Sequence, residues 1–185
     1  MDFSWVKDLA EQSNQKELAR RERLRRQSER DKQVALATAP FVEKLHLVVS
    51  ACAEEFNKFI QFPELRVTAG RVQKRLQRTV NENDPELAYP EEATSFGFSR
   101  CDWTYGIRGC RGEVEFIEVP TSGGALSVRL DEVGATPSRK FVAHLDEDGQ
   151  QIVWKQDGQV MDGQAIMTIC RDYFREFIER TNKSA

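Results

Sequence analysis

Histidine is scarce in this sequence, and cysteine pairs at metal-binding spacing are missing, which removes the usual signs of catalysis and of metal binding. Only two histidines occur, His46 and His144, and neither belongs to a local motif that supplies a nucleophile together with an orienting partner. The cysteines stand far apart, without the C-x2-C pairs of structural zinc sites, at Cys52, Cys101, Cys110 and Cys170. We therefore expect no catalytic site, no metal and no cofactor, and a non-enzymatic role rather than an enzymatic one. The spacing leaves open whether Cys101 and Cys110 form a redox disulfide across a hairpin.

Long apolar runs and a strong charge of one sign are also missing. The best apolar run, residues 45–53, is far shorter than the roughly 20 residues that span a bilayer. The opening sequence MDFSWVKDLAEQ has acidic residues and lacks the apolar core of a signal peptide, so we expect a cytoplasmic protein without membrane insertion. Because the net charge is -3, a nucleic acid would have to be bound by a local basic patch.

Proline and glycine are missing between residues 4 and 33, a segment rich in the helix-forming residues Glu, Gln, Lys, Arg and Ala. The segment predicts a charged helix of roughly 45 Å, at about 1.5 Å per residue. Its large apolar residues are too few for a continuous core-facing stripe. We therefore divide the chain into an N-terminal helical arm, residues 1–36, and a compact domain, residues 37–185. The arm is expected to be a coiled coil or a partner-binding helix.

The residues after the arm predict a core helix. Pro40 suits the first turn of a new helix, so we expect a break or kink between the arm and this helix. The apolar residues that follow step by three or four and share one helical face; they are Phe41, Leu45, Val48, Cys52, Phe56 and Phe59. Leu47, Val49 and Ile60 widen that face. Phe62-Pro63 is expected to end the helix.

Between residues 65 and 160 the helical period disappears, and short alternating segments between turn residues predict strands. Strands are expected at 65–67, 71–80, 95–109 with a break near Arg100, 113–120, 125–133, 141–145 and 150–155. Residues 71–80 also fit a helix, because Val72, Leu76 and Val80 share one face in either structure, but the β-branched residues in the segment favour a strand. The DEDG sequence between the last two predicts a hairpin, and Asp157-Gly158 a further turn. Asp162 is expected to cap a final amphipathic helix. The predicted fold is α+β: the arm, a helix, an antiparallel β-meander of five or six strands, and a helix.

Two basic tracts are candidate binding surfaces. The first, residues 16–32 in the arm, contains six arginines and places Arg23, Arg26 and Arg30 together on one helical face. The second, residues 66–78, includes Arg71, Lys74, Arg75 and Arg78. Neither has the interleaved aromatic residues that stack on bases. The mixed charges of the arm are typical of a solvated helix or of the flank of a coiled coil.

We therefore expect a non-enzymatic interaction or assembly module whose N-terminal helix self-associates or binds a partner protein. The candidate contacts are an apolar tip, Phe3, Trp5 and Leu9, and the arm residues Arg20, Arg23, Arg26 and Arg30. One alternative is a nucleic-acid-binding protein that uses both basic tracts. A second alternative is a small-molecule-binding or enzymatic domain with a pocket lined by Phe96, Phe98, Trp103, Tyr105 and Trp154.

Overall fold

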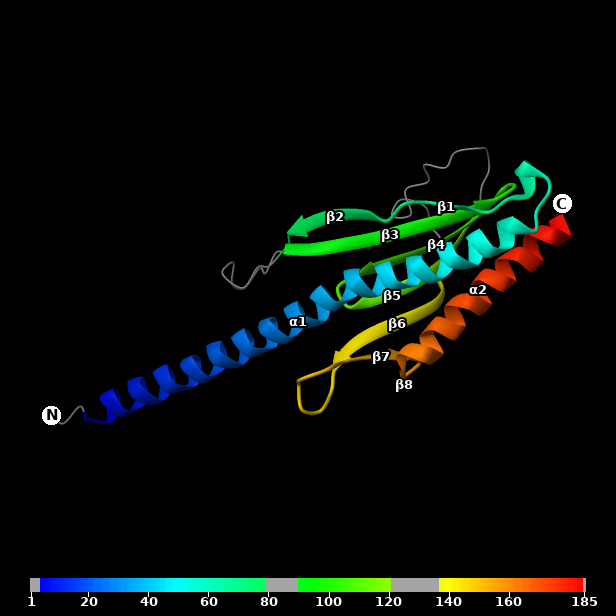
Figure 1. The fold of residues 1–185 in the computed structure, drawn as a ribbon. Helices are drawn as coiled ribbons and strands as arrows, with labels where there is room; N and C mark the ends of the chain where they lie inside the picture. The colour runs from blue at the N-terminus through cyan, green and yellow to red at the C-terminus, as the bar shows by residue number, and fades with distance from the viewer. Residues whose placement is uncertain (1–3, 79–89, 121–136, 185) are drawn as a thin grey trace.

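Two long helices enclose a run of strands in the sequence, which confirms the predicted α+β fold (Figure 1). The structure, a computed structural model, describes residues 4–78, 90–120 and 137–184. The helices are α1 (Ser4–Lys58), the short 3-10 helix η1 (Pro63–Leu65) and α2 (Gly163–Ser184). The strands are β1 (Thr68–Ala69), β2 (Gln73–Arg78), β3 (Pro90–Arg100), β4 (Trp103–Cys110), β5 (Glu113–Pro120), β6 (Pro137–Leu145), β7 (Ile152–Gln156) and β8 (Gln159–Met161). The strand expected at 125–133 lies outside the described residues.

In the described ranges, eight strands form one antiparallel sheet in the order β1-β3-β4-β5-β6-β7-β8, with β2 also paired to β3. The structure has more strands than the five or six predicted; β8, for example, has only three residues and is too short to show an alternating pattern. β1 and β2 lie along the same edge of β3, and between them the N–H of Gly70 donates to the carbonyl of Gly97 at 2.7 Å. The strand expected at 65–67 is displaced, because Pro63 begins the turn of η1 and pairing starts only at Thr68.

The turn residues act as the sequence predicts. In the β6–β7 hairpin, the Asp146 side chain accepts hydrogen bonds from the backbone N–H groups of Gln150 and Gln151. Asp157 and Gly158, with φ of 50° and 81°, form a tight turn between β7 and β8 that requires the left-handed region at both positions. Asp162 caps α2, since its Oδ1 lies 2.6 Å from the backbone nitrogen of Ala165.

The arm and the first core helix are a single helix, so the break predicted at Pro40 is absent. Proline has no N–H to donate to the carbonyl four residues earlier, which here belongs to Leu36. Leu36 is 60% exposed and Pro40 is exposed, so water can reach the carbonyl that loses its donor. Packing of α1 on the sheet immediately after Pro40, through Phe41 and Val42, holds the helical backbone in place.

The buried face of α1 is rotated from the face that the sequence predicts. Val42, Leu45 and Val49 are completely buried, whereas Leu47 is 67% exposed. Phe59 is 78% exposed, because α1 ends at Lys58 and the helical spacing no longer applies beyond it. The predicted core helix is thus present, but the prediction that Leu47 and Phe59 belong to its buried face was wrong.

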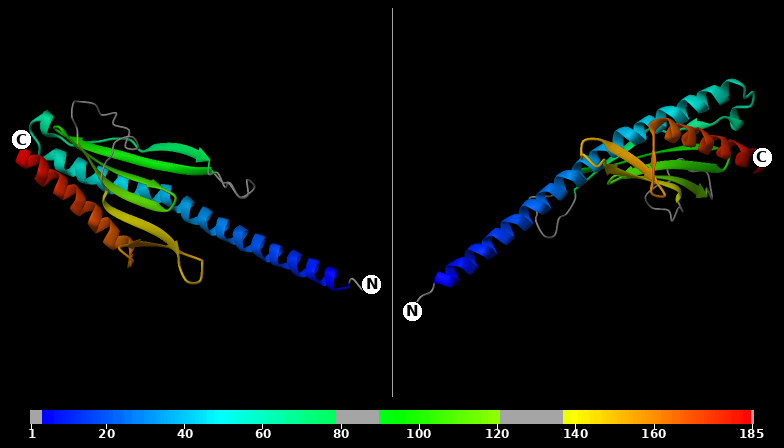
Figure 2. Two further views of the ribbon diagram at one scale, coloured as in Figure 1. Left: turned by 180° about the vertical axis from the view of Figure 1, so that it is seen from behind. Right: turned by 90° about the horizontal axis from the view of Figure 1, so that it is seen from below.

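Both helices cover one face of the sheet, and the half of α1 that carries the arm extends beyond it (Figures 1 and 2). α2 lies beside the second half of α1. Its aromatic residues enter the space between the layers, where the rings of Tyr173 and Phe116 are 4.8 Å apart and those of Phe177 and Phe98 are 5.0 Å apart. The Tyr173 hydroxyl donates to the carbonyl of Ile117 at 2.7 Å, which ties α2 to β5.

α1 also has the length and composition of a helix that could cross a membrane. One stretch of 18 residues in it has a mean hydropathy of 1.4. The best apolar run, residues 45–53, is shorter than this stretch, because such a mean tolerates two charged residues. Of that stretch 28% is buried, and α1 packs on the sheet through the completely buried Val42, Leu45 and Val49.

Candidate partner-binding arm

The arm is exposed along nearly its whole length. From Trp5 to Gln33 every residue of α1 is exposed except the half-buried Ser28, and burial begins at Val34. Two residues of the predicted apolar tip stand in solvent, with Trp5 59% and Leu9 53% exposed. Phe3, the third, lies outside the described residues. The core gains nothing from these side chains, although large apolar residues are normally buried.

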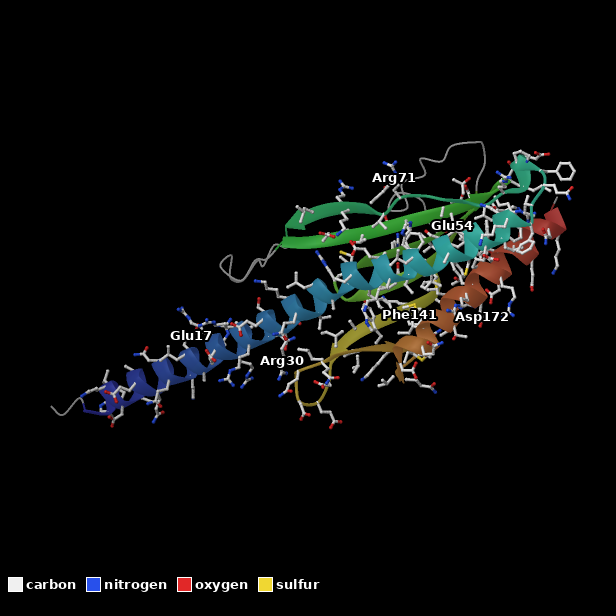
Figure 3. All side chains as sticks on the ribbon, in the orientation of Figure 1. Glu17, Arg30, Glu54, Arg71, Phe141 and Asp172 are labelled. Atoms are coloured by element: carbon white, nitrogen blue, oxygen red, sulfur yellow. The ribbon has the colours of Figure 1, made fainter. Side chains whose placement is uncertain are left out.

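Most arginines of the arm are neutralised by glutamates on the same helix. Glu17 binds both Arg20 (3.2 Å) and Arg21 (3.1 Å). Arg26 pairs with Glu22 at 2.8 Å, and Arg25 pairs with Glu29 at 3.3 Å. Figure 3 labels Glu17 on this part of α1. The hydrogen bonds from Arg21 and Arg20 lower the pKa of Glu17 below its usual value. Of the predicted contacts, Arg20 and Arg26 are therefore already paired within the helix.

Three other cations form what we call the cation row: Lys16, Arg23 and Arg30. Among the described residues, none of the three has an ion-pair partner. They recur every seven residues, so each lies about 10.5 Å along the helix from the next and within about 20° in rotation. Leu9 precedes Lys16 by the same interval. The cation row therefore continues the face on which Leu9 lies.

The second basic tract is not a continuous basic surface. The Nζ of Lys74 lies 2.6 Å from Glu43 on α1 and 3.0 Å from Glu92 on β3, and hydrogen bonds to these carboxylates raise its pKa. Arg75 lies on the other side of β2, because neighbouring residues of a strand face opposite ways. Arg71 stands at the sheet edge, far from Arg30 on the arm (Figure 3). The Arg78 side chain lies outside the described part of the structure.

The aromatic residues proposed as a pocket are packed into the core. Phe96, Phe98 and Tyr105 are at most 2% exposed. Trp154 stacks on Phe41 with ring centroids 4.0 Å apart, and Trp103 lies under the guanidinium of Arg180 at 4.6 Å. An open concavity of about 570 Å³ lies elsewhere, on the sheet, where Ala93 and Ser95 form part of its lining and Arg108 pairs with Glu115. The predicted aromatic residues are not among those that line it.

The histidines and cysteines occupy structural or isolated positions. His46 Nε2 donates to the carbonyl of Gly70 at 2.9 Å, which fastens α1 to the sheet edge, and His144 is exposed on β6. Cys101 follows β3 in the turn before β4, whereas Cys110 is the last residue of β4, so the two thiols lie at opposite ends of that strand. In the described ranges no three His, Cys, Asp or Glu side chains gather as a metal site.

One buried charge was missed by the sequence argument. Arg100 is 4% exposed and donates to the carbonyl of Leu65, to Thr181 Oγ1 and to Asn182 Oδ1 at 2.6–2.7 Å. Its guanidinium also lies 5.3 Å from the ring centre of Phe56. It joins the end of α2 to the turn after α1. No local motif marks this residue, because its partners are 35 to 82 positions away.

Comparison with known proteins adds no family to these observations. No family model matches the sequence, no curated protein matches it, and no solved structure matches its fold.

Proposed function

We propose that this protein is a non-enzymatic interaction module of the cytoplasm, which uses its arm to bind a partner protein or a second copy of itself. The observation that carries the proposal is the exposed arm itself. It is one helix with the core element that follows Pro40, yet its residues from Trp5 to Gln33 contribute nothing to the core. A helix with exposed Trp and Leu at one end offers large apolar area at a defined position, as interface anchors do.

A pair of matched variants of the full chain tests this role. Trp5→Ser/Leu9→Ser removes the described apolar tip, whereas Leu18→Ser changes a leucine outside it that is 67% exposed. We expect the first variant to lose its dimeric mass in light scattering, or its partner in a pull-down from cell extract, and the second to retain it. Thermal unfolding should be unchanged in both, since these side chains are solvated. Equal association by both variants and the wild type would contradict the proposal.

The two alternatives have less support. In a nucleic-acid interface built from both basic tracts, several cations are already paired within the protein. Lys74 pairs with Glu43 and Glu92, and Arg20 and Arg26 pair with glutamates of the same helix. Binding of labelled RNA or DNA that weakens steeply with salt would favour it nonetheless. The small-molecule alternative relied on aromatic side chains that instead pack against one another.

A further inference from the structure

The charge pattern of the arm restricts what can bind it. Residues 16–32 contain eight basic and four acidic residues, a net charge of +4. The four acidic residues are Glu17, Glu22, Glu29 and Asp31. The three glutamates are held by arginines, and Asp31 accepts a hydrogen bond from Gln27. Glu17 carries one charge for two arginines, so one positive charge of Arg20 and Arg21 stays uncompensated. Within the described residues, the other cations of this segment without an ion pair are the cation row and Lys32. Lys32 follows Arg23 by nine residues, which places it about 180° away on the opposite side of the helix.

The cation row and the apolar tip together have the spacing of a helix–helix seam. Leu9, Lys16, Arg23 and Arg30 repeat every seven residues, and Trp5 precedes Leu9 by four. Residues at intervals of seven, with others three or four positions away, are the ones that meet a neighbouring helix in a coiled coil. A partner helix rises by the same distance per residue, so its own residues at intervals of seven repeat at the same spacing of about 10.5 Å. A phosphate backbone could pair with the cation row but would leave Trp5 and Leu9 without an apolar partner.

A second copy of the arm does not complement this seam. In a parallel pair each member of the cation row would face itself, and like charges in contact are repulsive. In an antiparallel pair the two basic segments, each with a charge of +4, would still overlap. Leu9 of one copy would then lie opposite the polar C-terminal end of residues 16–32 in the other copy. Self-association along this face therefore leaves the cations without anions in either orientation, and in the antiparallel pair it also leaves the apolar tip without an apolar partner.

We infer that the arm binds an acidic amphipathic helix of another protein, whose carboxylates repeat every seven residues opposite Lys16, Arg23 and Arg30 and whose apolar residues cover Trp5 and Leu9. This inference rests on the proposed interaction role and specifies the chemistry of its partner. The apolar tip supplies the buried area, and the cation row sets the register and the direction of the partner helix.

The test uses the full-length protein and a labelled synthetic helix of about four heptads, with glutamate at three heptad-spaced positions and leucine opposite Trp5 and Leu9. A control peptide has the same composition, with its glutamates on the opposite helical face. Fluorescence anisotropy should show the first peptide binding about tenfold more tightly than the second. Arg23→Glu should weaken binding by about tenfold, whereas Lys32→Glu, which makes the same change in net charge on the other side of the helix, should leave it within about twofold.

Several results would overturn the inference. The first is equal affinity for the two peptides, and the second is an equal loss of peptide affinity in Arg23→Glu and Lys32→Glu. The third is tighter binding of single-stranded RNA or duplex DNA than of the acidic peptide. The fourth is a dimer of the protein that the peptide does not dissociate. If they occur while Trp5→Ser/Leu9→Ser still abolishes a protein contact, the interaction role stands and only the acidic partner is wrong. If Trp5→Ser/Leu9→Ser also has no effect, both proposals fail.

Discussion

Replacing Gly112 by alanine tests where α1 meets the sheet and the arm begins. Gly112 lies in the β4–β5 turn at a φ of 78°, and its N–H donates to Thr38 Oγ1 at 2.8 Å. A Cβ at this position would lie 2.3 Å from Cγ1 of Val34. The left-handed conformation costs alanine about 1–2 kcal/mol. Overlap with a packed side chain adds about 1–3 kcal/mol. We therefore expect Gly112→Ala to lower the free energy of unfolding by about 2–5 kcal/mol.

Two further variants separate these contributions, with urea unfolding followed by circular dichroism as the assay. Gly158 has a φ of 81° but nothing within 4 Å of its would-be Cβ, so Gly158→Ala should show only the conformational cost. Val34→Ala makes room beside Gly112, so in that background Gly112→Ala should lose its overlap cost of about 1–3 kcal/mol. If Gly112→Ala costs no more than Gly158→Ala and Val34→Ala gives no relief, then Val34 does not lie over the β4–β5 turn, and the continuous α1 is wrong.

Two further predictions concern buried groups of α2. Tyr173→Phe removes the hydroxyl that donates to the Ile117 carbonyl, and should lower the free energy of unfolding by about 1–2 kcal/mol in urea titrations; an unchanged midpoint would mean that this bond is not formed. Burial raises the pKa of the Cys170 thiol to about 12, so its reactive thiolate should be negligible from pH 7 to pH 9. Iodoacetamide should therefore modify exposed Cys101 in the native protein and Cys170 only after unfolding, as measured by peptide mass spectrometry; native labelling of both at one rate would refute the packing of α2.

The sequence predicted elements whose signals are local. The periodic apolar residues of α2, the Asp162 cap and the turns at Asp146 and Asp157-Gly158 depend on neighbours a few positions away, and the structure contains them all. The strand at residues 73–78 was also predicted, although its apolar residues fitted either a helix or a strand. These features succeed because backbone conformation and side-chain spacing decide them.

The features that the sequence did not predict depend on distant contacts or on solvent. Pro40 normally ends a helix, and only the exposure of Leu36 and the packing just beyond Pro40 show why α1 continues. The separation of the arm cations into paired ones, such as Arg26, and unpaired ones, such as Arg23, depends on which rotamers reach a glutamate. Arg100 is a candidate for neither binding nor catalysis, because its bonds close the fold.

Because α1 is continuous, its packed half fixes both how far the arm extends and in which direction around the helix axis the apolar tip points. Leu9 and Leu45 are 36 residues apart, which is about ten full turns, so the apolar tip points to the same side as the residues that pack on the sheet. Inserting one residue between them would advance the tip by only about 1.5 Å but would swing it by about 100° around the axis. An insertion of about 18 residues, five turns, would carry the tip about 27 Å farther out and return it to its original bearing. The arm can therefore change its length and keep its binding direction only when the insertion or deletion amounts to a whole number of helical turns.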